Sequence, residues 1–494
     1  MNIAVIGSGA TAYGVLLKLK EFSKKKDIKV TIFSKNLNYM NEVFLENKEN
    51  PKQNSNSNFT KNSYSEIRHN FGNSCEQIKI NNSNNLIYNI TNSGGLSDMW
   101  SGSAALPLNQ DLKNWGIKNV EIDKYYKIIV DKLSLSGEKN DFTFTNKNSE
   151  VYPLDFINSP PIKKHTLVKK LIKKFKENSK NINFQIGTNN VFVDTNLNSK
   201  NKCTNTQSCF SGCVKDSFFR PSKIIKGWID EKLFNYHNDL VSQINSKNNQ
   251  YEIITSNKKN LFFDKVFLCA GAYNSAKIII NSFGYPKNKV NLYDIPIIHF
   301  PIISLIPSIN IEKNTFGFSS ASGGITLNED NYYHLLFGQI PEEYFRSKFG
   351  KNIFSKVLKN FFGTFCLFSS IYGRNKDFLS YELTKDFDLN FSDHNKLKEI
   401  SKNFANALNE LKKIFFKEKF LVLNNFKVNG ESSSHYSSNL FEAYKIDHKN
   451  KGQFDKNLYV CDSSTLGYGS SSQPHTFFLM ANAYRLTTNI LNDI

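Results

Sequence analysis

The start of the chain carries a clear alternation of apolar and polar segments. Residues 3–6 form an apolar run of strand length that ends at Gly7-Ser8-Gly9, and residues 12–19 then place apolar side chains at helical spacing. A second apolar run ends at Ile32-Phe33. The pattern predicts a strand, a glycine turn, a helix and a second strand, an arrangement that binds a dinucleotide pyrophosphate at the helix N-terminus.

Two features of this unit depart from the usual dinucleotide pattern. Its third glycine is replaced by Ala12, and the acidic residue expected after the second strand is replaced by Ser34-Lys35. A glycine turn that only packs against its neighbours therefore stays open as the alternative to a nucleotide site.

The next part of the chain is less periodic. Residues 41–92 are rich in Asn, Ser and Lys and predict long surface loops. The segment 91–107, with adjacent glycines and a tryptophan, lets the backbone run close to a flat partner; a packed Gly/Ser turn is the alternative. Helical patterns follow within 111–135 and in a basic stretch at 163–178, and residues 182–193 predict a pair of strands.

Strand, turn and helix patterns return in the second half. Residues 262–269 form an apolar strand that enters the turn Ala270-Gly271-Ala272, which favours a doubly wound sheet. Strand patterns then occupy 296–308, 319–327 and 332–340, and a long amphipathic helix occupies 394–416. We expect this stretch to form a second lobe over the reaction site. The end of the chain adds an apolar strand at 458–461, a small-residue turn and a closing helix.

Composition changes this picture little. The chain has 494 residues, a net charge of +19 and seven cysteines. It contains no run of about eighteen apolar residues, so we expect no membrane span. The lysines are scattered, and the basic segment 169–180 has the pattern of a surface helix, which disfavours nucleic-acid binding and leaves contact with anionic lipid open. The N-terminus enters the first strand without a signal peptide, which favours the cytoplasm.

Five segments, taken in chain order, are similar to the signatures of one family. They are GSGATAYG at 7–14, GGLSDMWSGSAALP at 94–107, WGIKNVEIDKYYKII at 115–129, FLCAGAYNSAKIIINSFG at 267–284 and LYVCDSSTLGYGSSSQPHTFFLMANAYR at 458–485. Together they resemble the glucose–methanol–choline (GMC) family of FAD-dependent oxidoreductases, in its bacterial sugar- and alcohol-dehydrogenase branch.

The resemblance implies an α/β fold with a Rossmann-like FAD-binding domain of GMC type. This discontinuous domain would comprise residues 1–110, 182–284 and 436–494. A second lobe, built on a mostly antiparallel sheet, would comprise 111–181 and 285–435. The residues that the resemblance places against FAD are Gly7, Gly9, Ala10, Thr11, Ser34, Gly94, Gly95, Leu96, Ser97, Trp100, Ser101, Ala270, Gly271, Asp462, Ser463, His475 and Thr476. For Asp462, a turn-forming role alone is the alternative.

The family's catalytic histidine corresponds to His435 in SSSHYSSNLF, although the glycine of that motif is Ser438 here. His475 corresponds to the second catalytic residue, with a register uncertain by one or two positions. The resemblance implies removal of a hydroxyl proton by His435 while a hydride passes to flavin N5; a neutral imidazole suits this role near neutral pH. His299 and His334 lie in apolar strands, which is more typical of core residues.

Three cysteines lie close together in a polar stretch, at Cys203, Cys209 and Cys213. The segment resembles one that holds an iron–sulfur cluster in some bacterial GMC dehydrogenases, and thiolates are suitable iron ligands. A structural or zinc-binding thiol group and plain free thiols stay open beside it. The other cysteines, Cys75, Cys269, Cys366 and Cys461, have the apolar surroundings of core residues.

Three functions follow from these observations. The first is FAD-dependent oxidation of an alcohol group on a sugar, glycan or related polyol, with electrons passing to oxygen, a quinone or a protein partner. The second is an NAD(P)-dependent dehydrogenase, for which Ser34-Lys35 would suit a 2′-phosphate. The third is a flavoprotein scaffold without catalysis, indicated by the altered histidine motif.

Overall fold

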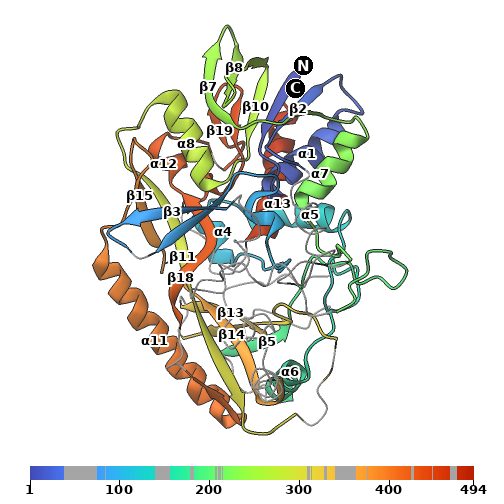
Figure 1. Ribbon diagram of the computed structural model, residues 1–494, viewed down its shortest axis with the longest axis vertical. Helices are drawn as coiled ribbons and strands as arrows, with labels where there is room; N and C mark the ends of the chain where they lie inside the picture. The colour runs from blue at the N-terminus through green and yellow to red at the C-terminus, as the bar shows by residue number, and fades with distance from the viewer. Residues whose placement is uncertain are drawn as a thin grey trace, which may run out of the picture.

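The computed structural model is built around two large sheets, one above the other (Figure 1). The residues that it describes are 1–37, 75–83, 85–138, 156–177, 183–205, 209, 213, 215–308, 312, 314–327, 331–339, 363–374, 376–423, 428–447, 449–467 and 475–493. Both chain termini lie at the top of the view, beside the upper sheet.

In the described residues, the upper sheet has six strands in the order β19-β20-β10-β1-β2-β6. All neighbours pair in parallel except β19, which runs antiparallel to β20. The bounds are β1 (Asn2–Ile6), β2 (Lys29–Phe33), β6 (Asn235–His237), β10 (Lys265–Leu268), β19 (Gln453–Asp455) and β20 (Leu458–Val460). The sheet thus joins the start, the middle and the end of the chain.

Both faces of the upper sheet are covered. In β1, Ile3 and Val5 belong to the apolar cluster that contains α1 (Ala10–Phe22) and α13 (Thr476–Leu491). Ala4 and Ile6 point the other way, into the cluster that contains α8 (Ala272–Phe283). Alternate residues of a strand face opposite sides, so burial on both sides explains why β1 is an uninterrupted apolar run. The remaining helices of this half are α4 (Asn109–Asn114), α5 (Asn119–Val130), α7 (Pro221–Asp230) and α12 (Leu440–Ala443).

The lower sheet is mostly antiparallel, as expected, and centres on the long strand β11 (Val290–Ser304). Within the described chain β11 pairs with β14, β15, β17 and β18. The other bounds are β3 (Cys75–Asn81), β4 (Leu86–Ile90), β5 (Phe184–Thr188), β12 (Ala321–Thr326), β13 (Tyr332–Gly338), β14 (Cys366–Tyr372), β15 (Leu379–Leu383), β16 (Leu389–Asn390), β17 (Phe420–Val422) and β18 (Val428–Ser438). A small third sheet contains β7 (Val241–Lys247), β8 (Gln250–Thr255) and β9 (Asn260–Phe263).

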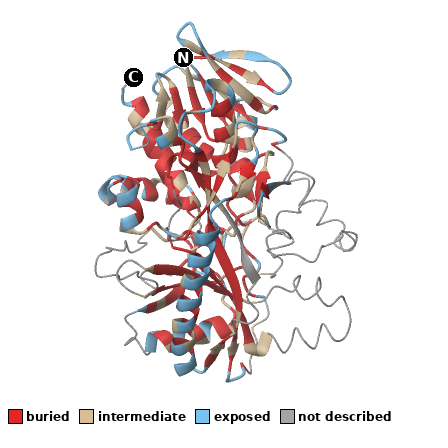
Figure 2. Ribbon diagram, turned by 90° about the vertical axis from the view of Figure 1, so that its left-hand side faces the viewer, coloured by how far each residue is buried: buried red, intermediate tan, exposed pale blue. Residues whose placement is uncertain are grey.

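Two helices cover the lower sheet, α6 (Thr166–Glu177) and α11 (His394–Lys417). Phe415 of α11 contacts Phe175 of α6, and both rings pack on Phe184 of β5. The opposite side of α11 faces solvent along its length (Figure 2). The amphipathic patterns of both helices therefore predicted their packing correctly.

Three local predictions are wrong. Residues 75–90 form the hairpin β3–β4, although the stretch 41–92 was expected to be loop; its first part, 38–74, lies outside the described residues. Only β5 forms within 182–193, because the following residues make isolated bridges instead of a strand. The predicted strand 262–269 is divided into β9 and β10 at Asp264, whose carboxylate accepts a hydrogen bond from the Asn2 N–H.

Strands from both expected domains share the lower sheet, since β3, β4 and β5 come from ranges assigned to the FAD-binding domain. The domain boundaries themselves stay a prediction. Among the helices that the structure describes, none is long and apolar enough to cross a membrane.

Candidate active site

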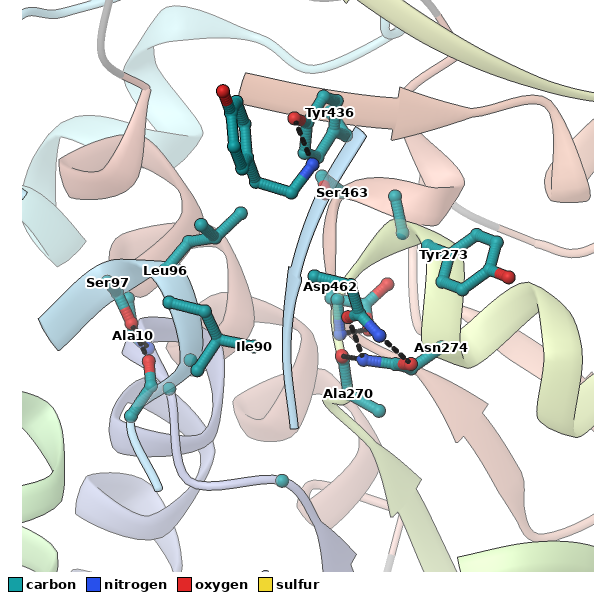
Figure 3. A pocket seen from close by; sticks show the side chains of 18 of the residues that line it. Ala10, Ile90, Leu96, Ser97, Ala270, Tyr273, Asn274, Tyr436, Asp462 and Ser463 are labelled. Atoms are coloured by element: carbon teal, nitrogen blue, oxygen red, sulfur yellow. Dashed lines mark hydrogen bonds between the residues drawn. The ribbon is translucent and has the colours of Figure 1, made fainter. Parts of the chain in front are cut away.

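A cavity of about 550 Å³ lies where the upper sheet faces the lower one. The strands β1, β10 and β20 are parallel, so their carboxyl ends meet at one edge, and the segments that follow them line the cavity. Figure 3 looks into it, with Ala10 and Ser97 on one side and Asn274 and Asp462 on the other. The opposite wall comes from β11, β13, β14 and β18 of the lower sheet.

Every residue predicted from the sequence to bind FAD or to act in catalysis lines this single cavity. They are Gly7, Gly9, Ala10, Thr11, Ser34, Gly94, Gly95, Leu96, Ser97, Trp100, Ser101, Ala270, Gly271, His435, Asp462, Ser463, His475 and Thr476. The structure thus brings together segments more than four hundred positions apart in the printed sequence. What each residue binds stays a prediction.

The turn after β1 requires glycine at its first position. Gly7 has φ +114°, and a Cβ there would lie 2.3 Å from the carbonyl oxygen of Cys269. Its N–H donates to the Phe33 carbonyl at 2.9 Å, which fixes the turn to β2. Gly9 caps α1, and its carbonyl accepts the first helical hydrogen bond, from the Tyr13 N–H. The N-terminus of a long helix therefore opens at the cavity, where its partial positive charge favours an anionic ligand.

Serine side chains join this turn to the segment at 94–97. Ser8 Oγ lies 2.7 Å from Ser34 Oγ and accepts a hydrogen bond from the Gly94 N–H. Ser97 Oγ accepts from the Ala10 N–H at 2.9 Å and donates to the Gly94 carbonyl at 2.6 Å. One helix N–H is thus already used by the protein, and the two glycine-rich segments form one rigid rim.

Asp98 and Trp100 fix the segment 94–97 of this rim to the rest of the protein. A Cβ on Gly94, which has φ +74°, would collide with the Asp98 carboxylate. That carboxylate accepts hydrogen bonds from the hydroxyl and N–H of Ser222, and burial raises its pKa to about 6. Trp100 is buried, and its Nε1–H donates to the Phe219 carbonyl at 3.0 Å.

Asp462 links the ends of β20 and β10. One carboxylate oxygen accepts from the Gly271 N–H at 2.8 Å and from the Ser275 hydroxyl at 2.5 Å, and the other accepts from the Ser464 N–H and hydroxyl. Burial raises the pKa of this carboxyl. Asp462 therefore stabilises the turn, and because it also lines the cavity, its contact with a cofactor stays a prediction.

The two predicted catalytic histidines lie side by side. The ring centroids of His435, on β18, and His475, at the N-cap of α13, are 5.8 Å apart, and both rings line the cavity. Burial lowers the pKa of His475 to about 4, so its imidazole is neutral at neutral pH. Tyr372 of β14 presents its ring to His435 at 6.1 Å in an edge-to-face contact. The turn residues 468–474 before His475 lie outside the described residues.

Sequence reasoning missed the lower wall of the cavity. His299, expected to be a core residue, lines the cavity, and its Nδ1 lies 2.7 Å from Ser370 Oγ. Its ring stacks on Phe368, and burial lowers its pKa to about 4. The amide pair Asn89–Asn274, visible in part in Figure 3, closes another side. Residues 295–303 are almost uninterruptedly apolar, so a period of two could not have found these residues without the pairing of the strands.

The cysteine segment lies apart from the cavity lining. Cys203 is buried against Val193, Phe218 and Phe316, and burial raises the pKa of its thiol. The Ser217 N–H donates to Cys213 Sγ at 3.1 Å. Over the described residues, which include all three cysteines, no group of three or more His, Cys, Asp or Glu side chains is placed to hold a metal ion. An iron–sulfur cluster at these cysteines stays a prediction. Cys269, Cys366 and Cys461 are buried, as expected of core residues.

The fold has a full-length counterpart among solved structures. A fungal aryl-alcohol oxidase superposes with a TM-score of 0.60 at 10% sequence identity, covering 99% of this chain and 98% of that chain. An oxidoreductase from Methanosarcina mazei is similar at a TM-score of 0.31 and 9% identity, too loosely to inform the fold. No protein-family model matches the sequence, and no curated protein sequence matches it. The chain therefore shares its fold with the aryl-alcohol oxidase.

Proposed function

We propose that the chain binds FAD in this cavity and oxidises an alcohol there. The observation that carries the proposal is the cavity itself, which connects a strand–glycine–helix turn at one end with the His435–His475 pair at the other. A nucleotide turn alone would fit many cofactors, and a histidine pair alone would fit many reactions. Their common cavity favours an extended dinucleotide whose reactive end reaches the histidines.

The residues present fit such a cofactor. The rim at Gly7–Thr11 and Gly94–Ser97 would hold the pyrophosphate, since its glycines permit close backbone approach and the α1 N-terminus favours negative charge. The start of α13, at Thr476, would face the isoalloxazine ring and favour negative charge there. FAD supplies the hydride acceptor, which no side chain of the protein offers.

The histidines would manage the proton of the substrate hydroxyl. We assign removal of that proton to His435 and hydrogen bonding of the hydroxyl oxygen to His475. Burial keeps His475 neutral, so its ring can donate or accept a hydrogen bond without adding a charge. The Tyr372 ring, edge-to-face against the His435 ring, would help to orient the imidazole. Fixing the base and the substrate hydroxyl relative to each other would raise the rate of alcohol oxidation, because the reacting groups are already positioned.

The lower wall favours an apolar or aromatic alcohol over the sugar expected from the sequence. Its apolar and aromatic members include Ile297, Leu336, Phe368 and Tyr372, beside the polar His299 and Ser370. A sugar would bring several hydroxyls against these side chains, and each buried hydroxyl without a partner is costly. The fungal oxidase of similar fold is named for an aryl alcohol, which is consistent with this choice.

A visible spectrum tests the cofactor first. We expect flavin bands in the purified protein and a released chromophore that migrates as FAD. Loss of the flavin bands when a benzylic alcohol is added without oxygen would support the reaction. A protein that stays colourless after incubation with FAD would overturn the proposal, and a flavin that no alcohol reduces would favour the scaffold.

Variants test the histidines. His435→Ala should slow flavin reduction by about a hundredfold to ten-thousandfold, the contribution typical of a general base. His475→Asn, which keeps a hydrogen-bonding group, should lose less. The matched control is His394→Ala, because His394 is exposed at the start of α11. An unchanged reduction rate in His435→Ala would refute its assignment.

A further inference from the structure

The end of the lower sheet away from the termini carries an exposed apolar surface among lysines. It is formed by the turn after β11, the outer side of α6 and the C-terminal end of α11, at the bottom of Figure 1. We call it the basal surface. It is separate from the cavity, whose lining contains none of its residues.

Three large apolar side chains project from the basal surface. Leu305 is 46% exposed, Ile306 47% and Phe416 60%. The backbone beneath them is held in place, since the Leu305 N–H donates to the Lys419 carbonyl at 2.8 Å. Lys170 Nζ donates to the Ile306 carbonyl at 2.7 Å. The turn therefore presents its apolar side chains outward from a fixed frame.

Lysines of α6 and of the C-terminal end of α11 lie around the turn after β11. The Phe175 and Phe415 rings are 5.0 Å apart on the inner side of the two helices, and both helices reach the turn after β11, where Lys170 donates to the Ile306 carbonyl and the Lys419 carbonyl accepts from the Leu305 N–H. The lysines of the basal surface are Lys169, Lys170, Lys173, Lys174, Lys176, Lys413, Lys417 and Lys419, and its acidic residues are Glu177, Glu312, Glu410 and Glu418. In the part of this surface that the structure describes, these eight positive and four negative charges leave an excess of four.

We propose that the basal surface docks the protein on an anionic lipid bilayer. Leu305, Ile306 and Phe416 would enter the headgroup–acyl boundary, and the lysines would contact lipid phosphates. A nucleic acid would use the lysines but would gain nothing from the apolar tip. A second copy of the chain docked through the same surface would be repelled, because both surfaces carry an excess of positive charge. A negatively charged bilayer satisfies both parts of the surface, and the docking does not depend on the function proposed for the cavity.

Sedimentation with lipid vesicles tests the docking on the full chain. We expect binding to phosphatidylcholine vesicles that contain about a third phosphatidylglycerol, with binding weakened by salt, and little binding to phosphatidylcholine alone. Phe416→Trp supplies a local probe, because a ring entering the bilayer boundary shifts its fluorescence to the blue.

Paired variants separate the two contributions. Lys173→Gln and Lys417→Gln should each weaken binding about fivefold. The double variant Ile306→Ser with Phe416→Ser should weaken it at least about tenfold. The matched control is Val120→Ser, which removes an apolar side chain that is 83% exposed on α5, outside the basal surface.

Each alternative occupant gives a distinct result that overturns the proposal. Wild-type protein that stays in solution with the anionic vesicles rules out docking. Binding that the serine variants retain and the glutamine variants lose would mean adsorption of charge without insertion, as for any polyanion. A dimer that Phe416→Ser converts to a monomer would identify the surface as an interface between copies of the chain.

Discussion

Mild acid should destabilise the fold through its buried histidines. His165, His299 and His475 are each buried, and burial lowers each pKa to about 4. In the unfolded chain a histidine has a pKa of about 6.5, so between these values the unfolded state binds more protons than the folded state. The stability that each contributes is complete above the unfolded pKa and is lost as the pH falls toward the folded one. From about pH 7 to about pH 5, the contribution of each histidine to the free energy of unfolding falls by about 2 kcal/mol.

A buried carboxyl acts in the opposite direction. Burial raises the pKa of Asp98 to about 6, so the folded state takes up this proton first. Over the same pH interval Asp98 adds about 1 kcal/mol to the free energy of unfolding. Burial also raises the pKa of Asp462, which therefore acts in the same direction. The three histidines together lose about 5.5 kcal/mol, which outweighs Asp98, so the net loss is about 4 kcal/mol before the Asp462 contribution, a large part of a typical domain's stability.

Urea unfolding at the two pH values measures this loss, and His165→Asn isolates one part of it. His165 lies outside the cavity lining, just before α6, and its Nδ1 accepts from the Leu167 N–H at 3.3 Å. Asparagine can accept the same hydrogen bond as a helix cap but does not titrate. The variant should match the wild type within about 1 kcal/mol at neutral pH and should lose about 2 kcal/mol less on acidification.

Two results would refute this reasoning. If His165→Asn and the wild type lost equal stability in acid, His165 would not be held neutral by burial. If acid stabilised the wild type, the carboxyls would dominate and the sign derived from the histidines would be wrong.

Three further changes test the turns of the cavity. Gly7→Ala should destabilise the fold by at least about 2 kcal/mol and abolish FAD retention, because the added Cβ would strike the Cys269 carbonyl. Gly227→Ala is the control, because an added Cβ there meets no described atom within 4 Å, and it should raise the free energy of unfolding by up to about 1 kcal/mol. Asp462→Asn should cost about 1–3 kcal/mol in urea unfolding, because the amide cannot accept on both sides. Ser438→Gly should cost about 1 kcal/mol by the same assay, through the loss of one buried hydrogen bond.

Local patterns predicted the upper half of the molecule well. β1, α1, α8, β20 and α13 are each specified by an apolar run, a turn and a helical period that lie within about twenty residues of one another. The closing of the cavity by parallel strand ends follows from that order, because parallel strands place their carboxyl ends together. The sequence therefore sufficed for the rim on which the cofactor is proposed to lie.

The lower wall depends on strand pairing, which local patterns do not encode. β11 pairs with β14 in a register that sets His299 opposite Ser370 and Ile297 opposite Tyr372. Residues 295–303 are almost uninterruptedly apolar, so the alternation that would reveal the cavity-facing side is absent from the sequence. His334, expected to be core, is fully buried beside Ser322 and lies outside the cavity lining. His299 and Leu336 both stand opposite Ser370, and His334 is two residues from Leu336, so the two histidines share a face of the sheet and differ in their position on it.

The altered histidine motif has a physical explanation in the same geometry. His435 is placed by the pairing of β18 with β11, and His475 is placed by α13, so nothing local fixes the separation of their rings. Ser438 supplies the missing link: its hydroxyl donates to the Ser464 carbonyl at 3.1 Å, and its carbonyl accepts from the Gly467 N–H. A glycine at 438 would retain only the second bond. Ser438, where the sequence resemblance would place a glycine, therefore joins β18, which carries His435, to the segment 464–467.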